Sequence, residues 1–173
     1  YTITYTTAGI CPNSSNVAVT INALDDASFN YGAAAYCVSD ADPTATITGL
    51  AGGTFTSAPA GLVINGATGQ IDVSSSTPGA YTITYTTAGT CPNTSNVAVT
   101  ITALDDASFN YGAAAYCVDA TDPTATITGV GGGAFTSAPA GLVINGATGQ
   151  IDVSASTPGA YTITYTTSGP CPN

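Results

Sequence analysis

The sequence predicts an all-β protein built from a repeated sandwich-like unit, and three observations support this prediction. Shifting the chain by 80 residues against itself matches about nine positions in ten, so one unit is written about twice. Thr, Val, Ile and Tyr recur between Gly, Pro, Asn and Ser, whereas strong helix formers other than Ala are few. A unit of this length is too long for one solenoid coil and suits a small β-sandwich.

Each strand of the unit is bounded by turn residues. The seven expected strands cover residues 27–31, 44–48, 54–58, 62–65, 70–73, 80–87 and 96–102. Between the fourth and fifth strands, NGATGQ supplies residues that tolerate a positive φ, which favours a tight connection. The period-two alternation of the last two strands places Tyr81, Ile83, Tyr85, Val97, Val99 and Ile101 in the core. Their partners 80 positions away are expected to be equivalent.

The repeat register divides the chain into three parts. Residues 1–22 are expected to be the last two strands of a preceding repeat, 23–102 a complete repeat, and 103–173 a second repeat that lacks its last strand. Such a unit exposes an unpaired strand edge. We therefore expect a head-to-tail contact in which a segment such as Asn16 to Asn22 completes residues 103–173 of the preceding unit, within a continuous chain rather than separate subunits.

The run from Phe55 to Thr87 carries a family resemblance. Its motifs, PAGL at 59–62, TGQI at 68–71 and TPGAY at 77–81, recur between Phe135 and Thr167. This pattern resembles the immunoglobulin-like repeats of bacterial surface proteins, and the whole unit is similar to tandem repeats of very large secreted adhesins of Bacteroidota-type bacteria. The resemblance implies tandem immunoglobulin-like β-sandwich domains arranged head to tail in an extracellular, cell-surface setting, and it names no ligand.

Charge and residue usage exclude several function classes. The chain contains no Lys, Arg or His and has a net charge of -10, so it cannot neutralise the phosphates of nucleic acid or of an acidic membrane surface. Its apolar runs are too short to insert directly into a membrane. Without His, Lys, Arg or Glu, the usual general bases are missing, so we expect no catalytic residues and no enzyme activity.

The five cysteines predict structural disulfides, because the chain has no His to complete a zinc site or to activate a thiol. Two pairings are open. Bonds within each domain would join Cys37 to Cys91 and Cys117 to Cys171, leaving Cys11 for a cysteine outside the sequence. Bonds between successive repeats would join Cys11 to Cys37 and Cys91 to Cys117. The first pairing is favoured because it closes larger loops, although it requires residues 33–37 to run back as an extra strand.

Adjacent acidic residues at the repeat junctions are the candidate metal ligands. Asp25 and Asp26, and their equivalents Asp105 and Asp106, are unchanged between the copies, which favours them as a Ca²⁺ site over the acids of the SDADP and DATDP loops. No other cofactor is expected.

The predicted function is a structural extracellular fibre or stalk, whose partners are identical repeats joined head to tail. The alternative is an adhesive module that binds a glycan or a surface and is rigidified by calcium. A functional amyloid is disfavoured, because Pro and Gly lie at nearly every strand boundary.

Overall fold

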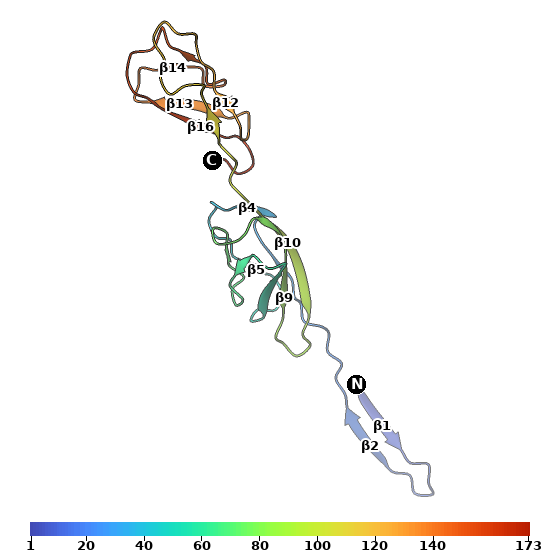
Figure 1. Cartoon of the computed structure of the whole chain (residues 1–173). Helices are drawn as coiled ribbons and strands as arrows, with labels where there is room; N and C mark the ends of the chain where they lie inside the picture. Colours follow the sequence, from blue (N-terminus) through green and yellow to red (C-terminus); the bar gives the residue numbers. More distant parts are fainter.

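We describe a computed structural model that covers residues 1–173 and contains sixteen strands and no helix. The chain is elongated (Figure 1): a hairpin lies at one end, the first repeat lies in the middle, and the second repeat lies at the other end. The all-β prediction is confirmed. The chain has no helix that is long and apolar enough to cross a membrane.

The first repeat is a two-layered sandwich. One layer is a four-stranded sheet in the order β4-β10-β9-β6, and the other consists of the small antiparallel pairs β3-β5 and β7-β8. The bounds are β3 Phe29–Asn30, β4 Ala35–Cys37, β5 Thr46–Ile47, β6 Thr54–Ala58, β7 Val63–Ile64, β8 Ile71–Asp72, β9 Gly79–Thr86 and β10 Thr94–Thr102. All seven expected strands are present.

The core between the two layers contains the side chains that the alternation predicted. Within the sheet, β10 runs antiparallel to β9, with Val97 opposite Ile83 and Val99 opposite Tyr81. All the predicted core residues of these strands are buried except Val97, which is partly buried against the cluster. At one end, the rings of Phe55 and Tyr85 pack with centroids 4.6 Å apart.

The turn between β7 and β8 follows the expected chemistry. Asn65 Oδ1 accepts hydrogen bonds from the backbone amides of Ala67 and Thr68. Gly69 has a φ of 68°, a conformation that favours glycine. Tyr31 reaches across from the first strand and donates a hydrogen bond of 2.5 Å to the Gly69 carbonyl oxygen. The turn is therefore tied to the residue that follows β3 in the same repeat.

One strand lies outside the predicted set. Residues 35–37 form β4, which pairs with β10 in parallel, Ile101 opposite Tyr36 and Thr102 opposite Cys37. The alanine-rich sequence of this segment shows no strand alternation, so only its pairing with β10 defines it. The strand places Cys37 beside the last residue of β10, where the chain passes to the second repeat.

The second repeat reproduces this arrangement with fewer paired strands. Its strands are β11 Phe109–Asn110, β12 Thr126–Ile127, β13 Ala134–Ala138, β14 Val143–Ile144, β15 Ile151–Asp152 and β16 Thr162–Thr166. They form the two-stranded sheets β11-β12, β13-β16 and β14-β15. Residues 115–117, the equivalents of β4, form no strand. The free edge of β16 is the one that its equivalent, β9, offers to β10 in the first repeat.

The N-terminal hairpin consists of β1 Thr2–Thr6 and β2 Ser14–Ala18, paired antiparallel. Its sequence is nearly that of β9 and β10, and burial equivalent to theirs was expected. That expectation is wrong: Ile3, Tyr5 and Val17 are exposed. The reason is that a two-stranded ribbon has no second layer to cover its apolar face.

Candidate functional site

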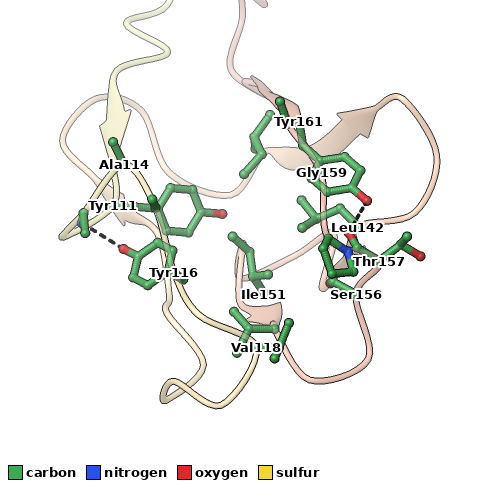
Figure 2. Close-up of a pocket in the computed structure, with 16 residues that line it drawn as sticks. Tyr111, Ala114, Tyr116, Val118, Leu142, Ile151, Ser156, Thr157, Gly159 and Tyr161 are labelled. Atoms are coloured by element: carbon green, nitrogen blue, oxygen red, sulfur yellow. Dashed lines mark hydrogen bonds between the residues drawn. The ribbon is translucent and has the colours of Figure 1, made fainter.

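The candidate site is an apolar groove on the second repeat. Its volume is about 530 Å³, and 12 of its 16 lining residues are hydrophobic. Figure 2 shows Tyr111 and Tyr116 on one side, Leu142 and Tyr161 on the other, and Ile151 between them. No charged side chain lines the groove. Its chemistry therefore suits an apolar occupant better than an ion or a charged ligand.

The first repeat shows what fills the equivalent space. There β10 lies between β9 and β4 and covers the side chains that correspond to the groove lining. Ile83 is fully buried in that repeat, whereas its equivalent Ile163 is only partly buried. Tyr36 is likewise half-buried, whereas Tyr116 is exposed. Because the surrounding sequences are nearly identical, the difference in burial follows from the presence of β10.

The segment that fills this space occurs twice in the chain. SNVAVTI is the sequence of residues 95–101 in β10 and also of residues 15–21, which begin in β2. Ile101 is 1% exposed in the core, whereas Ile21 is 75% exposed beyond the end of the hairpin. Residues 15–21 therefore leave largely exposed the apolar side chains whose equivalents close the first repeat.

A second cluster lies at each start of a repeat, where an aspartate holds the loop that contains the CPN cysteine. The Asp25 amide donates a 2.9 Å hydrogen bond to the Cys91 carbonyl oxygen, and Thr87 Oγ1 donates one of 3.0 Å to Asp25 Oδ2. Asn93 Nδ2 in turn donates to the Asp25 carbonyl oxygen at 3.0 Å. A Cβ on Gly89 would lie 2.5 Å from Asp25 Oδ2, so any larger residue here would have to displace the Asp25 carboxylate.

The same clamp recurs in the second repeat. The Asp105 amide donates to the Cys171 carbonyl oxygen at 2.8 Å, and Thr167 and Asn173 repeat the side-chain contacts at 3.0 and 3.2 Å. The junction aspartates thus connect the first residues of a repeat to its last loop. Each CPN loop is held at the end of its domain that faces the preceding repeat.

The second aspartate of each pair serves its own turn. Asp26 Oδ1 accepts from the Ser28 hydroxyl at 2.5 Å and from the Ser28 amide at 2.9 Å, and these bonds lower the pKa of Asp26. Ser108 lowers the pKa of Asp106 in the same way. Asp25 and Asp26 therefore have different partners, and no three acidic or cysteine side chains gather in the chain as a metal centre would require. Calcium binding at these pairs stays a prediction from sequence.

Removing the Asp25 carboxylate is expected to loosen the loop it clamps. The Asp25→Ala variant leaves the buried Thr87 hydroxyl without its charged acceptor, and we expect the free energy of unfolding of the first repeat to fall by about 1–2 kcal/mol. Amide hydrogen exchange of Asn93, which donates to Thr87 Oγ1, should become faster. The Asp25→Asn variant keeps an acceptor oxygen and is the control. Equal losses in both variants would contradict the proposed clamp.

The structure contains one disulfide, and it corrects both predicted pairings. Cys37 is bonded to Cys171, with their Cα atoms 5.6 Å apart and a sequence separation of 134. Neither the pairing of Cys37 with Cys91 nor that of Cys11 with Cys37 occurs, and Cys91 and Cys117 are free thiols. The reason is the direction of β4, which carries Cys37 to the end of its sandwich nearest the next repeat. Cys91 is held at the opposite end.

Acids of the SDADP and DATDP loops, the less favoured Ca²⁺ candidates, have defined structural contacts. Asp40 Oδ2 accepts from the Cys37 amide at 2.7 Å and so holds the backbone of the bonded cysteine. Asp42 Oδ1 accepts from the Val73 amide at 3.1 Å, and Asp122 repeats this contact with Val153. The DP dipeptide preserved in both loops marks the second contact in the sequence.

Comparisons with known proteins give only distant likenesses. No family model matches the chain, and no curated protein matches it. Among solved structures, it is similar to protocadherin gamma B2 extracellular cadherin domains 3-6, with 14% identity over 87% of this chain and 49% of that chain and a TM-score of 0.39. It is also similar to human CDH23 EC21-23 (16% identity, 82% of this chain, 58% of that chain, TM-score 0.39) and to mouse cadherin-23 EC22-24 (17%, 99%, 69%, 0.35). The chain thus spans about half the length of the first of these structures. With TM-scores this low, no conclusion about function follows.

Proposed function

We propose that this chain is part of a structural extracellular fibre, in which repeats join head to tail by inserting a strand into the groove of the preceding repeat. The strand has the sequence SNVAVTI, and in solutions of this chain a second copy supplies it from residues 15–21. One observation, made within the first repeat, supports this proposal. The identical segment 95–101 already occupies the equivalent space of the first repeat.

Exchange of strands makes the insertion favourable. β1 and β16 have the same sequence, TITYT, so β2 can leave β1 and pair with β16 in the register that β9 and β10 use. The backbone hydrogen bonds lost in the hairpin are replaced by equivalent ones. The apolar face of the strand, Val17, Val19 and Ile21, is mainly exposed in the hairpin and becomes buried in the groove, so hydrophobic burial drives the exchange.

The chain's composition fits an extracellular setting. It is joined across its repeats by a disulfide, and such bonds persist in oxidising environments outside the cytosol. Its net charge of -10, with no cation to offset it, keeps neighbouring shafts apart. Together with the sequence motifs shared with repeats of large bacterial adhesins, these properties support assignment to a bacterial cell surface.

A synthetic peptide with the sequence of residues 94–102 tests this proposal without requiring the hairpin to open. We expect the labelled peptide to bind the chain saturably, with one site per chain, and to protect the backbone amides of Ile163 and Tyr165 from hydrogen exchange. The control peptide contains Val97→Asp and Val99→Asp, which would place two charges in an apolar groove. It should not bind.

The same peptide distinguishes the fibre from the alternatives. Where the chain associates at higher concentration, excess peptide should shorten the assemblies, as measured by sedimentation velocity, because it competes with β2 for the groove. Assemblies that ignore the peptide, or binding that is the same for both peptides, would contradict strand insertion.

A further inference from the structure

We infer that the disulfide between Cys37 and Cys171 is one member of a continuous series, and that Cys117 forms the next member with Cys91 of a second copy. This inference rests on the proposed strand insertion and deepens it, since it identifies covalent partners at the joint. It also assigns a role to two thiols that are free within the chain.

The observed bond connects one repeat to the next rather than closing a domain. Cys37 belongs to the AYC segment of the first repeat, and Cys171 belongs to the CPN loop of the second. β4 brings Cys37 beside Thr102, the last residue of β10. Cys171 reaches the same place because Asp105 binds its carbonyl oxygen at the start of the second repeat. In Figure 1 the C-terminus accordingly lies beside the link between the two repeats.

Cys91 is the equivalent of Cys171 in the first repeat, and Cys117 is the equivalent of Cys37 in the second repeat. Asp25 holds Cys91 as Asp105 holds Cys171, with the amide-to-carbonyl bonds differing by only 0.1 Å, at 2.9 and 2.8 Å. Cys117 occupies the AYC position of the second repeat and is exposed, beside the groove residues Tyr116 and Val118. The two positions that are bonded inside the chain therefore recur unbonded: Cys91 is partly exposed at the end of the first repeat that faces the hairpin, and Cys117 is exposed in the second repeat.

Strand insertion brings these halves together. When residues 15–22 of a second copy fill the groove, residues 115–117 gain the neighbour that turns residues 35–37 into β4. The complete repeat of the second copy, residues 23–102, then follows the groove as residues 103–173 follow the first repeat. Its Cys91 takes the place that Cys171 has relative to Cys37. Groove filling thus creates the geometry in which the bond forms.

The bond requires an oxidant, which we identify as a small-molecule disulfide such as oxidised glutathione. The thiolate of Cys117 attacks one sulfur of that disulfide and releases one thiol, and Cys91 of the second copy then displaces the other. Two protein thiols lose two protons and two electrons, one S–S bond forms, and the oxidant leaves as two thiols. No metal or other cofactor enters the balance.

The test maps the bonds in a mixture of ¹⁴N- and ¹⁵N-labelled chains oxidised with glutathione. The chain has no Lys or Arg, so trypsin has no sites, but cleavage before aspartate places each cysteine in a separate peptide. Residues 72–104 contain Cys91 and residues 106–118 contain Cys117. We expect these two peptides to be linked, with mixed-isotope pairs present, and a non-reducing gel to show a ladder at multiples of 16.8 kDa.

Three variants make the result specific. Cys117→Ser and Cys91→Ser should each abolish the ladder while the Cys37–Cys171 peptide pair remains, and Cys11→Ser should leave the ladder intact. The inference is overturned if Cys117 pairs mainly with Cys11 or with another Cys117, or if only same-isotope pairs of Cys91 and Cys117 appear. A chain that associates by strand insertion but gives no Cys117–Cys91 pair also refutes this inference alone. A chain that does not associate refutes it together with the proposed function.

Discussion

The Ile101→Ala variant is expected to lower the free energy of unfolding of the first repeat by about 2–5 kcal/mol. Ile101 is 1% exposed and lies between β4 and β9, so truncation leaves a cavity lined by side chains that cannot collapse into it. Hydrogen exchange of the β9 amides measures the loss, because it reports on the first repeat separately from the second.

The matched control is Ile21→Ala, a change in the same sequence context. Ile21 is 75% exposed, so its truncation should change the stability of the isolated chain by no more than about 0.5 kcal/mol. The same change should weaken association between chains, since Ile21 becomes the equivalent of Ile101 after insertion. A large effect of Ile21→Ala on the stability of the isolated chain, or no effect of Ile101→Ala, would contradict the exposure of Ile21 and the burial of Ile101.

Much of the fold could be predicted because the local signals and the tertiary structure agree. Alternation placed Tyr81, Ile83 and Tyr85 on one face of β9, and this face is the core. Turn residues located the strand ends. β4 could not be predicted from its own residues, because AYC has no alternation and becomes a strand only by pairing with β10. The exposure of β2 could not be predicted either, since burial depends on a second layer that the hairpin lacks.

The candidate site, too, could be predicted only in part from the sequence. The groove lies beside β16, where the equivalent of β10 would pack, so the repeat register locates it in the sequence. The cysteine pairing depended on which end of a sandwich each loop occupies, and β4 decides this for Cys37. Loop length, which favoured Cys37 with Cys91, reflects only the entropy of the unfolded chain. The bond to Cys171 closes a longer loop, with a separation of 134, than any pairing that the sequence suggested.

The clamping role of Asp25 and Asp105 was also outside the reach of sequence. The repeat register puts both residues at the junctions, but adjacent carboxylates suggest an ion as readily as a hydrogen-bond acceptor. Only the fold brings Thr87 and Asn93 within bonding distance of Asp25 from more than 60 positions away in sequence.

Reduction of the disulfide is expected to change how the chain responds to force. In the oxidised chain, a pull applied to tags at the two ends passes from Cys37 through the S–S bond to Cys171, so the residues between them carry no tension. Reduction places all 134 intervening steps on the path, and the contour length released on unfolding should grow by about 450 Å at 3.3–3.6 Å per residue.

Single-molecule extension with and without a reductant measures this difference, and the Cys91→Ser/Cys117→Ser double variant, which keeps the bond, is the control. In a series of such bonds, the applied force would pass along the backbone only between the CPN cysteine of one repeat and the AYC cysteine of the next. In this chain that stretch is Cys91 to Cys117. Each repeat could then lose its fold without the fibre lengthening by the full repeat. Equal contour lengths in oxidised and reduced chains would contradict both the bond and this mechanical role.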